Sequence, residues 1–294
     1  MQKNELERFS ILTKLNVLYK ILEVRKQVSR WKSEGLTVGL VPTMGGLHNG
    51  HKSLINSASK KCDKVIVTIF INPTQFGDDE DLDTYPRTRK SDTTLISDAG
   101  GAAVFIPNVS EMYPSDFSTK VSVSGLTDML CGTSRPGHFD GVTQIVTKLL
   151  NQVAADMAFF GEKDWQQLAI IRRLVRDLDI PTKIASVATH RDEFGLALSS
   201  RNSYLSSSQL KTARKLSSVL QMTAYNIASG GYASVECAKA VQTLLKSGFD
   251  KIDYIECRHS HSLEAIERTT EDECRIFAAA YIDNIRLIDN HIVV

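Results

Sequence analysis

Two short apolar runs, joined by a glycine-containing turn and a helix, constrain the fold of this chain more than any other feature. Val38–Val41 is long enough only for a short strand, and Lys64–Asn72 is a near-continuous β-branched run, as in a strand buried on both faces. Between them Gly45 and Gly46 mark a turn, and Ser53–Lys61 continues as a helix. Strand, helix and strand in this order predict a parallel βαβ unit.

The same alternation continues to about residue 188. Further strands are predicted at Ala102–Ile106, Asp156–Phe160 and Lys183–Val187. Helices are predicted over Leu12–Trp31 (ended by Gly35), up to Asp98, over Val142–Gln152 and up to Leu178. Five parallel strands with helices between them predict a doubly wound, Rossmann-like α/β domain at 1–188.

The remainder of the chain differs in kind. Helices are predicted at Ser206–Ile227 and Ser234–Ser247, and strands at Lys251–Cys257, Arg275–Tyr281 and Ile285–Asp289. This pattern predicts a smaller α+β domain at 189–294.

Composition narrows the class of protein. The 294 residues are 42% apolar and carry a formal net charge of +1 without a basic block, so nucleic acid is not expected as the main ligand. The five cysteines are scattered and odd in number, which favours reduced thiols. Acids in the first turns (Glu5, Glu7) argue against a secretory signal, and no apolar run approaches membrane-spanning length. We expect a cytoplasmic protein without a membrane partner.

Two histidines follow the first strand. His48 and His51 lie three residues apart, on the same side of the first turn of the predicted helix. A helix N-terminus beyond the carboxyl end of a parallel strand is a phosphate-binding position, so both rings are expected to face phosphates. Alone the pair is weak evidence, because surface histidines at helical spacing are common.

Polar residues also follow other predicted strands. Asn72 and Gln75 could bind a hydroxy acid, although Asn72 also begins an ordinary Asn-Pro turn. Lys163 could reach a phosphate. Arg135 and His138 precede a helix and could bind an anion, the alternative being that both are solvated. No metal site is predicted.

A serine pair and an arginine stand just beyond the predicted domain junction. Ser199, Ser200 and Arg201 follow a glycine-containing segment. The alternative for the serines is that they cap the helix predicted from Ser206.

Six motifs in order, between about Val38 and Leu205, resemble the pantothenate synthetase (pantoate–β-alanine ligase) family of the His-x-x-His adenylyl-transferring superfamily. They are Pro42-Thr-Met-Gly-Gly-Leu-His-Asn-Gly-His51, Ile71-Asn-Pro-Thr-Gln-Phe76, Tyr85-Pro-Arg-Thr88, Arg135-Pro-Gly-His-Phe139, Phe160-Gly-Glu-Lys-Asp-Trp-Gln-Gln167 and Leu198-Ser-Ser-Arg-Asn202. The C-terminal part matches in layout only. Residues Ala188–Gly195 depart from the commonest family pattern.

The resemblance implies a two-step reaction. The carboxylate of pantoate attacks the α-phosphorus of ATP to give pantoyl adenylate and pyrophosphate, and the amine of β-alanine then displaces AMP. Mg²⁺ would be shared mostly with ATP oxygens. The resemblance also suggests a homodimer.

The resemblance assigns residues to these steps. Positive charge over the reacting phosphates would come from His51, His48, Lys163 and Arg201. ATP would contact Pro42, Thr43, Met44, Gly45, Gly46, Leu47, His48, Asn49, Gly50, His51, Gly161, Glu162, Lys163, Asp164, the backbone of His190, Leu198, Ser199, Ser200 and Arg201. Pantoate and β-alanine would contact Gln75, Gln167, Asn72, Tyr85, Arg135 and His138.

Two rival functions remain at this stage. A nucleotidyltransferase acting on a phosphate ester would be expected to carry more arginine or lysine where Gln75 and Gln167 stand. A metal-binding module, or a nucleotide-binding regulator without catalysis, could use His48, His51 and His138. No carboxylate or cysteine completes a metal-ligand set with them at suitable spacing.

Overall fold

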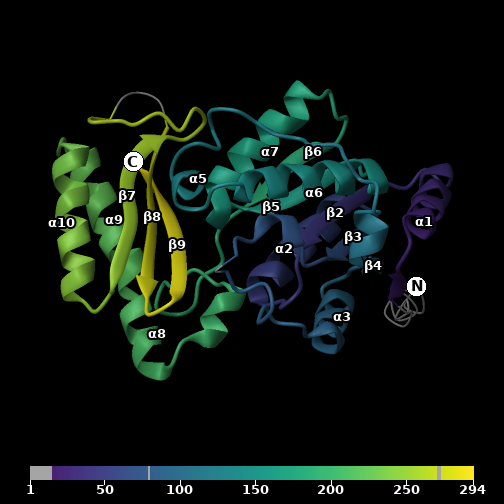
Figure 1. Ribbon diagram of the computed structural model, residues 1–294, viewed down its shortest axis with the longest axis horizontal. Coiled ribbons are helices and arrows are strands. Elements are labelled where there is room, and N and C mark those ends of the chain that lie inside the picture. The colour runs from purple at the N-terminus through teal and green to yellow at the C-terminus, as the bar shows by residue number, and fades with distance from the viewer. Residues whose placement is uncertain (1–14, 79, 270–272) are drawn as a thin grey trace, which may run out of the picture.

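A six-stranded parallel sheet forms the larger part of the molecule (Figure 1). The computed structural model describes residues 15–78, 80–269 and 273–294. In sheet order, the strands are β1 (Asn16–Leu18), β4 (Ala103–Phe105), β3 (Lys64–Ile69), β2 (Val38–Thr43), β5 (Met157–Gly161) and β6 (Lys183–Val187). The interior strands are almost wholly buried, as the β-branched composition of β3 predicted.

Helices cover both faces of this sheet. On one face, apolar side chains of α1 (Ile21–Ser33), α6 (His138–Val153) and α7 (Trp165–Asp177) share a core with β2 and β5. On the other face, α2 (Asn49–Lys61) and α3 (Arg89–Asp98) pack around Ile55 and Ile96. The doubly wound α/β prediction is confirmed.

The predicted helix Leu12–Trp31 is wrong at its start, because the sheet contains a sixth strand there. Asn16–Leu18 pairs in parallel with β4, in the register Asn16↔Ala103. The helix begins only at Ile21, where the Glu23 carboxylate accepts hydrogen bonds from two preceding backbone amides. Gly35, at φ 77°, follows its C-cap as predicted. The part of the prediction before residue 15 lies outside the described residues.

The strand order places a topological switch at β2. This strand pairs with β3 on one side and β5 on the other, so the chain winds in opposite directions from it. Ligands of open parallel sheets bind beyond the carboxyl ends of the strands at such a point. Here those ends are Thr43 and Gly161.

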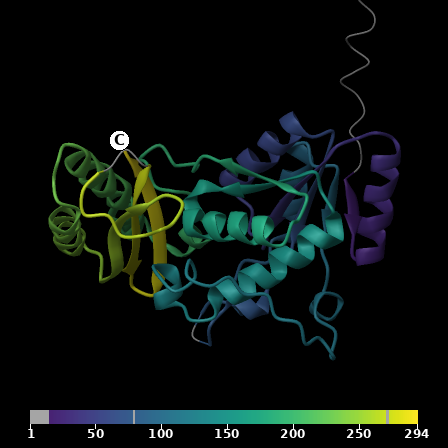
Figure 2. The ribbon, with the colours of Figure 1, turned by 90° about the horizontal axis from the view of Figure 1, so that it is seen from above.

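The C-terminal part is an antiparallel sheet backed by helices. Strands β7 (Lys251–His259), β8 (Cys274–Ile282) and β9 (Ile285–Val293) pair in sequence order, and α9 (Lys215–Ala228) and α10 (Ala233–Lys246) contact them. Figures 1 and 2 place this sheet between those helices and the larger sheet. The predicted helix Ser206–Ile227 is two helices, α8 (Ser207–Ala213) and α9, separated by Arg214.

Two further observations concern the chain as a whole. Most buried apolar residues between Leu196 and Val293 form a separate hydrophobic cluster, which agrees with a smaller second unit, while Leu263 and Phe277 belong to the larger core. The boundary at 188/189 stays a prediction. Among the described residues, no helix combines the length and apolar character that crossing a bilayer requires.

Helix α6 packs very closely on the short 3₁₀ turn η2 (Pro73–Gln75). A Cβ at Gly141 would lie 2.3 Å from the Thr74 carbonyl oxygen and 2.6 Å from the Gln75 Cα, so only glycine fits there. The Asn72 Nδ2 also donates to the Gly141 carbonyl at 3.0 Å. Position 141 therefore sets the distance between α6 and the turn that carries Gln75.

Gly141→Ala should separate these two elements. We expect it to lower the free energy of unfolding by about 1–3 kcal/mol, as overpacking of a tight contact does. Asn151→Ala, at an exposed position of the same helix, is the matched control and should change stability little. Urea denaturation measures both variants. Because alanine normally stabilises a helix relative to glycine, a Gly141→Ala protein more stable than the parent would contradict the tight contact.

Candidate active site

A cavity lies over the carboxyl ends of β2, β3, β5 and β6 and collects most of the predicted site residues. Those that line it are Pro42, Thr43, Met44, His48, Gly50, His51, Asn72, Gln75, Tyr85, Arg135, His138, Gly161, Lys163, Asp164, Gln167, His190, Leu198, Ser199, Ser200 and Arg201. Gly45, Gly46, Leu47, Asn49 and Glu162 are not among the lining residues. Val187, Ala188 and Thr189, which were not among the predicted site residues, line it as well.

The glycine loop is held by a buried carboxylate that the sequence analysis missed. Asp92, 2% exposed, accepts hydrogen bonds from the backbone N–H of Gly46 at 3.1 Å and of Leu47 at 2.9 Å. Gly45 and Gly46 have φ values of 90° and 62°, which explains the two glycines. Amide groups expected to face phosphates are thus already paired with protein, and an ATP contact at these residues stays a prediction. The position of Asp92 in the first turn of α3 is the sequence feature that could have pointed to this carboxylate.

The two histidines face each other at the start of α2, with ring centroids 4.2 Å apart. The His48 Nδ1 accepts from the Gly50 amide at 3.1 Å, and the His51 Nδ1 accepts from the His48 amide at 3.3 Å. Since each Nδ1 is an acceptor, each neutral ring carries its proton on Nε2. Both rings are therefore oriented as hydrogen-bond donors.

Neither histidine carries the positive charge that was expected of it. Burial, with Lys163 next in importance, lowers the pKa of His48 to about 4. Burial, followed by His48 and Lys163, lowers the pKa of His51 to about 3. At neutral pH both rings are neutral in this state, because an imidazolium here would be desolvated and next to another cation. Of the four residues expected to supply positive charge, Lys163 and Arg201 are the cations that line the cavity.

Lys163 lies in the 3₁₀ turn η3 (Glu162–Asp164), directly after β5. Its side chain is 18% exposed, and its Nζ lies 3.7 Å from the Asp164 carboxylate. The turn is held from the C-terminal sheet: Asn290 Nδ2 on β9 donates to the carbonyls of Glu162 at 2.9 Å and Lys163 at 3.0 Å. No local sequence signal connects Asn290 with a loop more than 120 residues earlier.

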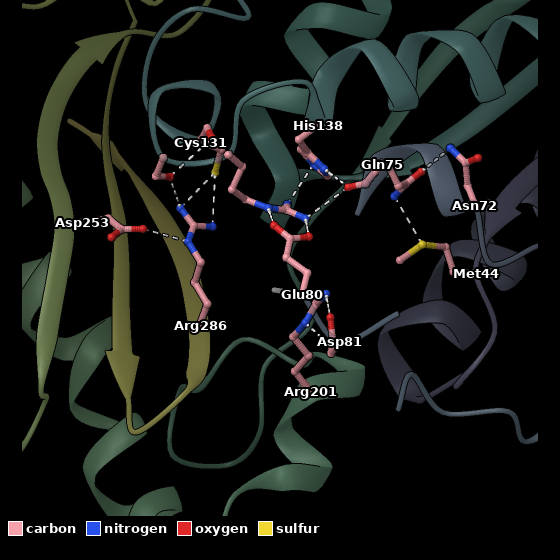
Figure 3. Close-up of polar contacts among 12 residues, drawn as sticks. Met44, Asn72, Gln75, Glu80, Asp81, Cys131, His138, Arg201, Asp253 and Arg286 are labelled. Atoms are coloured by element: carbon pink, nitrogen blue, oxygen red, sulfur yellow. Dashed lines mark hydrogen bonds and ion pairs between the residues drawn. The ribbon is translucent and has the colours of Figure 1, made fainter. Parts of the chain in front are cut away.

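The serine–arginine segment docks against the glycine loop from the other side. Ser200 Oγ donates to the Gly46 carbonyl at 2.9 Å, and Ser199 Oγ accepts from the Arg201 amide. Arg201 forms a two-point ion pair with Asp81, at 2.9 and 2.5 Å (Figure 3). The cap of α8 is Ser206, so the alternative in which Ser199 or Ser200 caps that helix is wrong.

Arg135 and His138 hold the Gln75 turn. Arg135 donates to the Glu80 carboxylate from two nitrogens, at 2.6 and 2.5 Å, and its Nη1 lies 2.9 Å from the His138 Nε2. His138 Nδ1 lies 2.8 Å from the Gln75 carbonyl. The ring must donate to that carbonyl from Nδ1, so Nε2 accepts from Arg135. With 15% of the Arg135 side chain exposed, the alternative of solvated side chains is wrong.

The two glutamines differ in how far they are already bonded. The Gln75 side chain makes two hydrogen bonds: its Oε1 accepts from Asn72 Nδ2, and its Nε2 donates to Met44 Sδ at 3.3 Å. Gln167 lines the same cavity from α7, and its side chain makes no hydrogen bond within the described part of the chain. Asn72–Gln75 forms a turn, which was the alternative interpretation of this segment, and Asn72 and Gln75 also line the cavity.

The segment that departs from the family pattern forms a closed turn. The His190 carbonyl accepts from the Leu198 amide at 2.9 Å, and Arg191 bridges Ala197. Arg191 also pairs with the buried Asp289 of β9 at 2.7 and 2.8 Å. The departures are thus accommodated by pairing within the turn and to the C-terminal sheet. An adenine contact at the His190 backbone stays a prediction.

The lowered pKa values predict a loss of stability in mild acid. An unfolded imidazole titrates near pH 6.5, so below that pH unfolding takes up protons that folded His51 accepts only near pH 3. The stability is therefore complete above about pH 7 and falls as the pH drops through 6.5 towards the folded pKa. His51→Gln should remove up to about 2 kcal/mol of the difference in unfolding free energy between pH 7 and pH 5.

Urea denaturation at both pH values measures this difference. His261→Gln, at an exposed histidine of the C-terminal unit, is the control with which the His51→Gln effect is compared. A His51→Gln protein with the parent's full pH dependence would contradict a neutral, buried imidazole.

Comparison with known proteins identifies relatives that match most of the chain. The family model described as "Pantoate-beta-alanine ligase" matches residues 16–292. A "Pantothenate synthetase" of Dinoroseobacter shibae is 50% identical over 275 residues, covering 94% of this chain and 98% of the relative. The protein of the same description from Paramagnetospirillum magneticum is 49% identical over 278 residues, covering 95% and 98%.

Solved structures agree with these relatives. A pantothenate synthetase structure from Thermus thermophilus superposes with a TM-score of 0.88 at 39% identity, covering 94% of this chain and 99% of that one. A pantoate–β-alanine ligase from Francisella tularensis, described as complexed with beta-gamma ATP and β-alanine, has a TM-score of 0.79 at 33% identity, with coverages of 95% and 97%. The chain therefore belongs to the pantoate–β-alanine ligase family.

Proposed function

We propose that this chain joins pantoate to β-alanine at the expense of ATP, in the cavity over β2 and β5, through a pantoyl-adenylate intermediate. Family membership over nearly the full chain supports the ligase reaction. The observation that carries the proposal is that the two histidine donors, the side chains of Lys163 and Arg201 and the two glutamines line one cavity. A phosphate group and a small hydroxy acid could thus be held side by side.

In the first step, the chain's task is to place the pantoate carboxylate against the α-phosphorus and to stabilise the charge that builds on the phosphate oxygens. We assign His48 and His51 as neutral Nε2–H donors to these oxygens. Lys163 supplies a positive charge from η3. Arg201 reaches the phosphates by exchanging its Asp81 partner for a phosphate oxygen.

The carboxylate of pantoate is already ionised, so this step needs no general base. Gln75 and Gln167 are assigned to the hydroxyl and carboxylate side of pantoate, because both border the cavity next to the histidines. In the second step the neutral amine of β-alanine attacks the acyl carbon and the bond between that carbon and the phosphate oxygen breaks. AMP leaves with the oxygen, and the proton lost by the nitrogen goes to solvent. Arg135 and His138 support this side of the cavity through the Gln75 turn.

Mg²⁺ fits this site as a companion of ATP. In the described part of the chain, no group of three or more histidine, cysteine or acidic side chains is arranged to hold a metal. The carboxylate of Glu80 is paired with Arg135, and that of Asp81 is paired with Arg201. A magnesium ion would therefore be held mainly by phosphate oxygens and water, and it would neutralise phosphate charge.

Several wider properties belong to the same proposal. We place the domain boundary at 188/189, in keeping with the separate hydrophobic cluster that begins at Leu196. We propose a cytoplasmic location, since cysteines that are scattered and odd in number favour reduced thiols. The homodimer rests on the family resemblance alone.

An assay for AMP tests the reaction directly. We expect AMP only when ATP, pantoate and β-alanine are all present, and pyrophosphate already without β-alanine, because the adenylate forms first. Each substrate is omitted in turn, and products are separated by chromatography. Release of ADP in place of AMP would rule out the adenylate route.

His51→Ala tests the donor role of the histidine pair. Loss of one positioned donor to a developing phosphate charge should lower kcat for adenylate formation about 10²- to 10³-fold, with a much smaller change in the Kd of ATP. Single-turnover release of pyrophosphate measures the step, with melting curves on the same preparations. His261→Ala is the control. A folded His51→Ala enzyme that forms adenylate at the parent rate would remove His51 from the chemistry.

A further inference from the structure

The amide of Asn72 has only one orientation that its surroundings allow. Its side chain, in a residue only 1% exposed, lies 3.0 Å from the Gly141 carbonyl of α6. A carbonyl can only accept, so the NH₂ end of the Asn72 amide must face it. The opposite end, Oδ1, then accepts from Thr74 Oγ1 at 3.0 Å and from Tyr113 Oη at 2.9 Å.

This orientation fixes the next amide in turn. The second proton of Asn72 Nδ2 points to Gln75 Oε1, at 3.0 Å (Figure 3). A flipped Gln75 would set one NH₂ group against another. Gln75 therefore keeps its oxygen on Asn72 and turns its Nε2 toward Met44 and the cavity, where Met44 Sδ, at 3.3 Å, is a weak acceptor. A stronger acceptor entering the cavity would take that donor.

Tyr113 stands at the far end of this series of hydrogen bonds, which runs through Asn72 to Gln75. It follows the short helix α4 (Val109–Met112), and its ring packs edge-on against Phe117 with centroids 5.3 Å apart. Burial raises the pKa of the Tyr113 hydroxyl, so it keeps its proton and remains a donor. Tyr113 is not among the cavity-lining residues, so its hydroxyl acts on a ligand only through Asn72 and Gln75.

We propose that Tyr113 is a positioning residue for pantoate. Its hydroxyl, relayed through Asn72, holds the Gln75 amide with Nε2–H toward the cavity, so that this point of the site binds an acceptor oxygen of the substrate and rejects a donor. The proposal rests on the proposed function, in which Gln75 contacts pantoate. It also gives Asn72 the role of orienting Gln75, because its amide is fully bonded to protein.

Tyr113→Phe removes the hydroxyl and keeps the ring. We expect the KM for pantoate to rise roughly threefold to tenfold, the factor that corresponds to one neutral hydrogen bond, with the KM for ATP unchanged within about twofold. Phe117→Leu is the matched control, since it alters the ring packing around Tyr113 without touching Asn72. It should leave the pantoate KM at the parent value. An equal rise in the pantoate KM for both variants would show a packing role and overturn the proposal.

A double-mutant cycle separates the relay from a structural effect. If Tyr113 acts through Gln75, Tyr113→Phe should change the pantoate KM no further once Gln75→Ala is present. A separate variant tests whether Gln75 donates a hydrogen bond to pantoate. Gln75→Glu puts an oxygen in place of Nε2 and should raise the pantoate KM more than Gln75→Ala does. A Glu variant that binds pantoate as well as the parent would overturn the donor assignment.

The failures of the two proposals can be told apart. If Gln75→Ala raises the pantoate KM and Tyr113→Phe adds its own factor on top, the relay is wrong and the pantoate site stands. If Gln75→Ala leaves the pantoate KM unchanged while the enzyme still makes AMP, the assignment of Gln75 to pantoate is wrong, and the relay falls with it.

Discussion

The geometry of the site depends first on one buried carboxylate. Asp92 binds the amides of Gly46 and Leu47 and thereby fixes the turn between β2 and α2. Helix α2 can then begin with His48 as its N-cap. The His48 ring accepts from the Gly50 amide, and the His51 ring accepts from the His48 amide. A carboxylate that satisfies the two loop amides lets the loop be tight without leaving polar groups unpaired. The direction of both Nε2–H groups follows from this turn.

The C-terminal sheet completes the site, and β9 is the strand that does so. Asn290 holds the Lys163 turn, Asp289 holds Arg191 beside the cavity wall, and Arg286 donates to Ser134 Oγ at 3.1 Å, next to Arg135. Arg286 is itself held by Asp253 at 2.9 Å (Figure 3). These contacts join residues far apart in sequence, so the Lys163 turn and the segment around Arg135 share one support.

Features of the fold and the site that depend only on neighbouring residues could be predicted from the sequence. Apolar runs located the parallel strands from β2 onward, and polar residues after those strands marked the cavity wall. Strand β1 was missed because it has only three residues, too few to show a strand pattern next to an amphipathic helix. Asp92, Asn290 and Tyr113 were missed because their roles exist only once distant segments meet. The charge state of His51 was wrong for a related reason, since burial and neighbouring cations appear only in the folded chain.

The ion pair between Arg201 and Asp81 also has a consequence for charge in the exchange proposed for Arg201. A phosphate that binds Arg201 replaces a carboxylate of the same sign, so the guanidinium has an anionic partner before and after the exchange. Dissolved salt screens both partners, and its effects largely cancel in the difference between them. At this wall of the cavity, selection thus depends on which anion fits the planar fork of the guanidinium better, rather than on the total attraction of a bare cation.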